Sequence, residues 1–171
     1  MSTVFRFCIV LSALGLGTAA RAEKAVLECI ADTWVEPGGP ASHGRDDELV
    51  LMKGGAVALE FRSALVAGWN IEKATLLLHV RQGRVPGVVR VVPLADPWDE
   101  SRAAWAEVLR AAGHPFKTRH YGQGYAAIEL DPAILRGHGL AIFSSGGPVH
   151  FDSREMRDYS PYLLVEGMPG K

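Results

Sequence analysis

Several aromatic and polar side chains lie near expected loops and could bind a sugar. Sugar binding uses an aromatic ring for stacking and planar polar side chains beside it for hydrogen bonds to hydroxyl groups. The side chains that fit this chemistry are Trp34, His43, Arg45, Trp98, Arg119, Tyr121 and Tyr125. Each aromatic ring could instead pack in the interior, because large aromatic side chains are mostly buried. Trp105 and Tyr162 are expected in the core.

Three aspartates could take part in a calcium site. Calcium is bound by about six to eight oxygen atoms, often from several loops. Asp46 and Asp47 belong to the densest run of carboxylates, and Asp152 lies in the closing part of the chain. The sequence has no calcium-binding loop of the EF-hand type, and a run of acidic residues can equally form a solvated turn. A structural calcium ion and a solvated turn both stay open.

A second charged group is expected to be structural. Arg154 and Glu155 are neighbours at an expected strand end, so their side chains should point to opposite faces, and one of them should face inward. A buried charge needs a partner, and Asp32 in the first strand, Arg62 and Arg90 are available. We predict that Asp32, Arg154 and Glu155 form an ion-pair network that ties the last strand to the first. The alternative is a pair of residues that contacts a ligand.

Catalytic motifs are absent from the sequence. It contains no Gly-x-Ser-x-Gly, His-Glu-x-x-His or Cys-x-x-Cys motif and no glycine-rich phosphate loop. Paired carboxylates such as Asp99 and Glu100 do not occur at a spacing typical of a general acid and base. We therefore predict a protein that is not an enzyme.

The first 22 residues resemble a secretory signal. Arg6 precedes an apolar run over residues 7–16, and small residues lead to the cleavage pattern Ala20-Arg21-Ala22. The apolar run is about half of the roughly twenty residues that a membrane span needs. We expect a secreted protein, extracellular or periplasmic, with no membrane span after cleavage and a single domain over residues 23–171. The net charge of −1 and the lack of a basic run argue against a nucleic-acid partner.

The elements that must position these residues are short β-strands. Alternating or β-branched runs separated by turn residues predict strands over Ala25–Val35, Glu48–Met52, Ala56–Phe61, Ala74–Val80, Val88–Leu94, Tyr125–Leu130, Gly139–Ser144, Val149–Ser153 and Tyr162–Val165. The second and third are expected to form a hairpin across Gly54-Gly55. This pattern predicts an all-β protein, an antiparallel β-sandwich of jelly-roll type. One short helical insertion is expected over residues 101–112, and a single helical turn at Ile134-Leu135.

With the strands in this order, the sequence resembles the DNRLRE domain, also called the disaggregatase-related domain. The segments that carry the resemblance are Ala31-Asp32-Thr33-Trp34-Val35, Ala58-Leu59-Glu60-Phe61, Ile71-Glu72-Lys73-Ala74-Thr75-Leu76, Trp98-Asp99-Glu100-Ser101, Phe151-Asp152-Ser153-Arg154-Glu155 and Pro161-Tyr162-Leu163-Leu164-Val165. Together they span almost the whole mature chain. Two departures from the family pattern are Arg62, where an acidic residue is usual, and the alanine-rich segment around Trp105.

The resemblance implies a secreted jelly-roll module, in a family that includes alginate-binding, carbohydrate-binding members. It therefore implies a non-catalytic module that binds a polysaccharide, possibly an acidic one. The basic segment Lys117-Thr118-Arg119-His120 could meet an acidic sugar or could be an ordinary solvated loop. The alternatives are a structural or adhesive module that binds a protein partner of the cell envelope, and a small polysaccharide-active enzyme.

Overall fold

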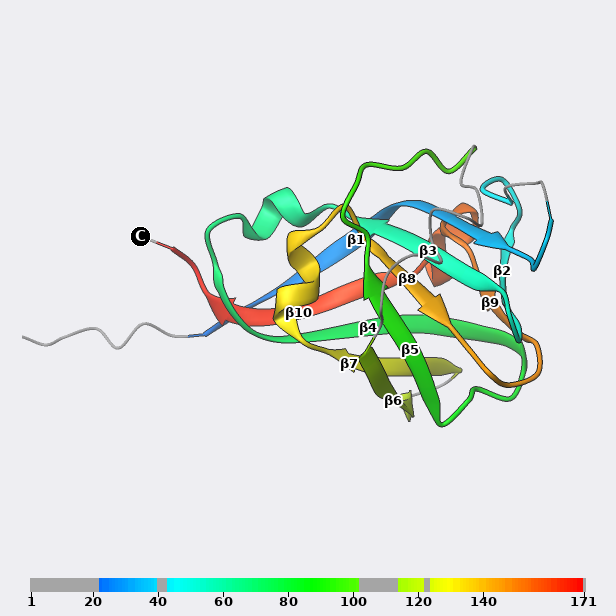
Figure 1. The fold of residues 1–171 in the computed structure, drawn as a ribbon. Coiled ribbons are helices and arrows are strands. Elements are labelled where there is room, and N and C mark those ends of the chain that lie inside the picture. The colour runs from blue at the N-terminus through cyan, green and yellow to red at the C-terminus, as the bar shows by residue number, and fades with distance from the viewer. Residues whose placement is uncertain (1–21, 40–42, 102–113, 122–123, 171) are drawn as a thin grey trace, which may run out of the picture.

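The computed structural model describes residues 22–39, 43–101, 114–121 and 124–170. Ten strands occupy most of these residues (Figure 1). They are β1 Glu23–Val35, β2 Glu48–Leu51, β3 Ala56–Phe61, β4 Asn70–Gly83, β5 Val88–Pro93, β6 His114–Tyr121, β7 Tyr125–Leu130, β8 Leu140–Phe143, β9 Val149–Asp152 and β10 Tyr162–Met168. Three short 3-10 helices lie between them: η1 Ser63–Val66, η2 Pro132–Arg136 and η3 Arg154–Tyr159.

Eight of these strands form a closed antiparallel ring in the order β10-β1-β3-β8-β5-β6-β7-β4, because β4 also pairs with β10. The long strands β1 and β6 each pair with different neighbours along their two halves. The first half of β1 pairs with β10 and the second half with β3, with a register shift between Cys29 and Ala31. The prediction of an all-β antiparallel fold is therefore confirmed, in the form of a closed sheet.

Strands β9 and β2 branch from the second half of β4. The first half of β4 pairs with β7 and β10, and from Val80 onward it pairs with β9. Figure 1 shows β2 and β9 together at one end of the ring, with η3 next to them. Through this branch, Asp152 at the end of β9 and the following helix η3 lie at one end of the ring.

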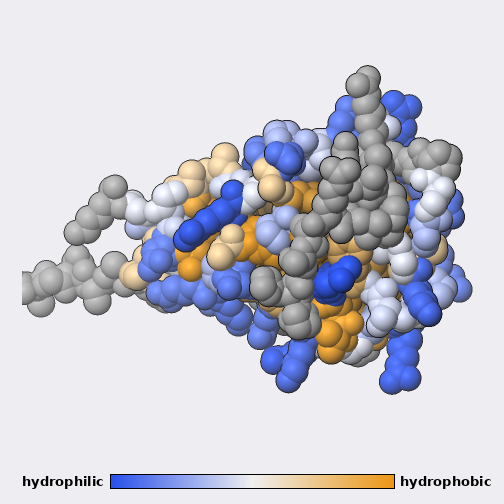
Figure 2. Space-filling view, viewed as in Figure 1, coloured by the Kyte–Doolittle hydropathy of each residue, from blue (hydrophilic) through white to orange (hydrophobic). Residues whose placement is uncertain are grey.

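The interior of the ring is filled by one side of each strand. On β4, Leu76 and Leu78 are fully buried in the main core, whereas the intervening Leu77 and the following His79 point to the opposite face. A second apolar cluster lies on the outer face of β3, β8 and β5 and contains Val35, Ala56, Val92, Ala141 and Phe143. Figure 2 shows hydrophobic side chains gathered in the middle of this view and hydrophilic ones around the rim.

The expected hairpin between the second and third strands is wrong. Gly55 does close a turn, since its N–H donates to the carbonyl of Met52 at 3.0 Å. However, β2 pairs with β9, and β3 pairs with β1 and β8. Leu49, Val50 and Leu51 of β2 are buried, so long-range packing decides which strand β2 pairs with.

Strand β6 differs from the sequence pattern, which predicts a basic loop over residues 117–120. In the structure Phe116 and Thr118 are half-buried and alternate with the exposed Lys117 and Arg119, the pattern of a strand with one solvated face. The expected helical turn at Ile134 is confirmed as η2, where the Asp131 carboxylate accepts the N–H of Ala133 at 2.9 Å. The helical insertion predicted over residues 101–112, with Trp105, lies almost entirely outside the described residues.

The described residues contain no helix long and apolar enough to cross a membrane.

Replacement of Leu163 should show how strongly the ring depends on β10. Leu163 is fully buried in the core, so Leu163→Ala should lower the free energy of unfolding by roughly 2–5 kcal/mol. The measurement is the midpoint of urea denaturation. Leu65→Ala is the matched control, because Leu65 is 57% exposed and should change stability by less than about 0.5 kcal/mol. Equal losses in the two variants would contradict this account of the core.

Candidate functional site

The outer face of β4 carries polar and aromatic side chains opposite its core residues. His79 pairs in register with Tyr125 on β7, and Leu77 pairs with Tyr162 on β10. Asp152 comes from the end of β9 and Tyr159 from the end of η3. We define the tyrosine–histidine surface as His79, Arg81, Tyr125, Asp152, Tyr159 and Tyr162.

A histidine–aspartate pair lies at the centre of this surface. His79 Nδ1 is 2.5 Å from Asp152 Oδ2, and Asp152 Oδ1 accepts a hydrogen bond from Arg81 Nε at 2.9 Å. The Asp152 side chain is only 6% exposed, so both its oxygens are engaged by protein donors. Because the carboxylate is an acceptor, the proton lies on His79 Nδ1, and in the neutral ring Nε2 is an acceptor.

Aromatic rings surround the His79 imidazole. Tyr159 stacks on it with 4.3 Å between centroids, and Tyr125 meets it edge-on at 5.0 Å. Tyr125 in turn meets Tyr162 edge-on at 6.0 Å. Burial, followed by the nearby tyrosines and Asp152, raises the pKa of Tyr125, so its hydroxyl stays protonated. The contacts hold the rings in fixed orientations while Tyr159 remains 45% exposed.

Gly124 leaves the space that this arrangement needs. Its φ of +83° lies in the left-handed region that glycine adopts most readily. A Cβ at this position would lie 2.8 Å from His79 Nε2. The turn before β7 therefore approaches the imidazole closely only because residue 124 has no side chain.

Arg81 joins the surface to a strip of carboxylates. Besides Asp152 it contacts Asp47 at 3.1 Å and Glu48 at 3.8 Å. Glu48 also accepts from His150 Nδ1 at 3.0 Å. The hydrogen bond from Arg81 lowers the pKa of Asp47, which therefore stays ionised at neutral pH.

The aspartates expected to bind calcium are in two places. Asp47 and Asp152 share Arg81, whereas Asp46 contacts His43 Nδ1 at 2.9 Å. Among the described residues no group of three or more His, Cys, Asp or Glu side chains is arranged to hold a metal ion. In the described structure these carboxylates contact Arg81 and the imidazoles of His43 and His79.

The expected ion-pair residues gather at the end of the ring. Asp32 is 1% exposed, and its Oδ2 accepts the backbone N–H of Arg154 at 2.7 Å. The Arg154 guanidinium contacts Glu100 at 2.7 Å and Glu155 at 3.2 Å. The expectation that Arg154 and Glu155 point to opposite faces of a strand end is wrong. They begin η3, capped by Ser153, so their side chains lie together, and Asp32 is held by a backbone N–H.

The first pair of predicted ligand-binding residues packs together. Trp34 and His43 stack with centroids 3.7 Å apart and an interplanar angle of 13°, and both are half-buried. Within the described part of the chain, Trp34 Nε1, His43 Nε2 and Arg154 Nε are buried without a hydrogen-bond partner. In this stack each ring covers one face of the other, so that face is not accessible to a sugar.

The other predicted ligand-binding residues are scattered. Arg45 lies exposed in the loop before β2, and Trp98 Nε1 donates to the carbonyl of His138 at 2.9 Å. Arg119 is exposed and pairs with Glu129 at 3.3 Å. The side chain of Tyr121 lies outside the described part of the chain. Of the seven predicted residues, the structure places Tyr125 on the tyrosine–histidine surface.

His79 and Arg81 are not among the site residues that the sequence predicts. Tyr162 is predicted in the core. Tyr162 is half-buried and faces Tyr125. The signal that could have found His79 and Arg81 is their shared phase on β4, opposite to Leu76 and Leu78. Their partner Asp152 is 73 residues away from His79, a pairing that the strand pattern alone does not predict.

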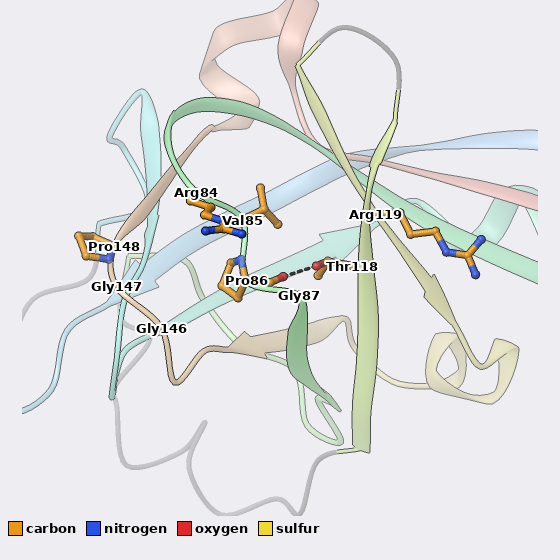
Figure 3. A pocket seen from close by; sticks show the side chains of 9 residues that line it. All are labelled: Arg84, Val85, Pro86, Gly87, Thr118, Arg119, Gly146, Gly147 and Pro148. Atoms are coloured by element: carbon orange, nitrogen blue, oxygen red, sulfur yellow. Dashed lines mark hydrogen bonds between the residues drawn. The ribbon is translucent and has the colours of Figure 1, made fainter.

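A groove of about 540 Å³ lies at another place, where the β4–β5 and β8–β9 connections meet β6 (Figure 3). Its lining comprises Arg84, Val85, Pro86, Gly87, Thr118, Arg119, Gly146, Gly147 and Pro148. The Thr118 hydroxyl donates to the carbonyl of Pro86. In Figure 3 the side chain of Arg84 lies beside Val85 and Pro86, whereas Arg119 extends away from the other lining residues.

No family model matches this sequence, and no curated protein matches it.

Asp32 should make stability depend on pH. Burial, opposed by the Arg154 N–H, raises the pKa of Asp32 from 3.8 to about 7. Between these values the folded state binds more protons than the unfolded state, so stability falls as pH rises, by roughly 4 kcal/mol in total. Asp32→Asn should remove this component and be more stable than the natural chain at pH 8.

The measurement is urea denaturation of both proteins from about pH 4 to pH 8. The difference between their unfolding free energies isolates Asp32 from the other carboxylates. A difference that does not change with pH would contradict the assignment.

Arg157 should store backbone strain beside the tyrosine–histidine surface. Its φ of 40° and ψ of −72° are unfavourable for a residue with a side chain, at a cost of roughly 1–3 kcal/mol. Arg157→Gly should raise the free energy of unfolding by about 1 kcal/mol, because glycine loses part of the gain through its flexible unfolded state. The neighbouring Asp158→Gly, without a positive φ, should lower stability. Thermal melts of both variants provide the test, and a loss of stability in Arg157→Gly would be the contrary result.

Proposed function

We propose that this protein is an exported, non-catalytic module of jelly-roll type that binds a polysaccharide on the tyrosine–histidine surface. One observation carries the proposal: Tyr159 is 45% exposed while it stacks on an imidazole that Asp152 holds in place. A fixed, half-exposed aromatic ring beside anchored polar groups is the arrangement that stacking on a sugar ring requires.

Preorganisation supports this choice over the residues predicted from the sequence. The imidazole of His79 is fixed by a hydrogen bond at 2.5 Å and by two rings. A ligand therefore has to order few side chains, which reduces the entropic cost of binding. By contrast, Trp34 and His43 form a closer stack in which both side chains are only partly exposed, whereas Tyr159 is 45% exposed.

The resemblance to the DNRLRE domain points in the same direction. It spans segments at both ends of the mature chain, including Phe151 to Glu155, which contributes Asp152 to the proposed site. The secretory signal predicted over residues 1–22 would deliver the module to an extracellular or periplasmic location, where polysaccharides are available.

A protein-binding module of the cell envelope is a second candidate. Val26 and Ile30 on β1 are 54% and 39% exposed, and Val26 pairs in register with Leu164 on β10. Exposed apolar side chains on one strand can mark a protein-interaction surface. This candidate predicts that replacing Val26 weakens binding to a partner, whereas the polysaccharide proposal predicts that replacing Tyr159 weakens binding to a glycan.

Replacement of Tyr159 tests the proposed site. A glycan array with the mature chain would identify a polysaccharide, and calorimetry would measure its affinity. Tyr159→Ala should weaken binding about tenfold or more, because the stacking ring is lost. Leu65→Ala is the matched control, since Leu65 is also exposed but lies in η1. A flat array, or equal affinities for the two variants, would refute the proposal.

A further inference from the structure

The polar edge of the tyrosine–histidine surface is rich in carboxylates. Arg81 is surrounded by three carboxylates, those of Asp47, Glu48 and Asp152. These three acidic side chains therefore surround a single guanidinium group. On η3 the exposed Arg157 and Asp158 cancel each other, and on β7 Glu129 pairs with Arg119.

Asp47 is the carboxylate that a ligand could reach. Its side chain is 64% exposed, compared with 34% for Glu48 and 6% for Asp152. Asp152 uses both oxygens internally, and Glu48 is bound to His150. The hydrogen bond from Arg81 lowers the pKa of Asp47, so this charge persists at neutral pH.

The tyrosines add a second attraction for positive charge. The face of an aromatic ring has a negative potential and attracts a cation within about 6 Å of its centre. Tyr159 is 45% exposed, and Tyr125 and Tyr162 lie beside the same imidazole or beside each other. The tyrosines are linked to Asp47 through His79, Asp152 and Arg81. Exposed aromatic faces and an exposed carboxylate on one surface both attract ammonium groups.

We propose that the tyrosine–histidine surface selects polysaccharides whose sugars carry ammonium groups over neutral and acidic ones. This inference rests on the proposed function and names the ligand class of that site. It differs from the acidic polysaccharide that the sequence suggested, because the carboxylates around Arg81 would repel an anionic chain. The basic side chain of Arg84 lies at the separate groove of Figure 3.

The test compares sugar oligomers of equal length that carry different charges. The probes are a β-1,4-linked glucosamine hexamer with every amino group acetylated and the same hexamer with every amino group trimethylated, which is cationic at every pH. Calorimetry at neutral pH and low salt should give an affinity about tenfold or more higher for the trimethylated hexamer. A galacturonic acid hexamer should bind more weakly than either. The preference should shrink in high salt, because salt screens exposed charges.

Two variants locate the source of the preference. Asp47→Asn removes the exposed charge and should reduce the ratio of the two affinities to about threefold or less. Glu129→Gln is the matched control, since Glu129 is 52% exposed on the neighbouring strand β7 and pairs with Arg119. It should leave the ratio unchanged. Thermal melts establish that both variants are folded, and the comparison of hexamers on the natural chain decides the inference if Asp47→Asn does not fold.

The outcomes separate this inference from the proposed function. Equal affinities for the acetylated and trimethylated hexamers overturn the inference, while binding that depends on Tyr159 still supports a polysaccharide site. Tightest binding of the acidic hexamer, lost in Arg84→Ala but kept in Tyr159→Ala, would overturn it and place the ligand in the groove. If no glycan binds, both proposals fail.

Discussion

Three consecutive residues between β9 and η3 hold together the parts of this protein on which the rest depends. Asp152 binds His79 and Arg81 of β4, the Ser153 hydroxyl donates to the carbonyl of Asp46, and the Arg154 N–H donates to Asp32 of β1. Each bond joins a different element, and Asp32, Asp152 and Ser153 are almost fully buried. Buried polar groups are costly unless they are satisfied, so this corner admits few other arrangements. It also sets where η3 begins, and therefore where Tyr159 lies.

Strand β4 connects the core with the candidate site. One face contributes Leu76 and Leu78 to the interior, and the other presents His79 and Arg81. The strand exchanges neighbours along its length, from β7 and β10 to β9. That exchange allows side chains from three other elements, β7, β9 and η3, to meet around the imidazole of His79. Because the same backbone supports both faces, the packing of the leucines also fixes the positions of the polar side chains opposite them.

Closure of the sheet removes the two free edges that the same eight strands would have in an open sheet. Strand β10 pairs on one side with β1 and on the other with β4, so the last strand completes the ring that the first strand opens. Unpaired strand edges can bind other chains nonspecifically. In this protein one outer strand face carries the tyrosines, and another carries the second apolar cluster, whose side chains are buried.

The sequence by itself determined the local elements. Alternation along Ala56–Phe61, Ala74–Val80 and Tyr125–Leu130 predicted strands that the structure contains, and Asp131 with Pro132 predicted the turn of η2. Only the tertiary structure decided which strands pair and which side chains meet. The period of two residues in a strand specifies a face but no partner, so the hairpin across Gly54-Gly55 was expected and did not form. For the same reason His79 and Asp152 could be placed on strands but not beside each other, since their contact exists only once β9 has docked on β4.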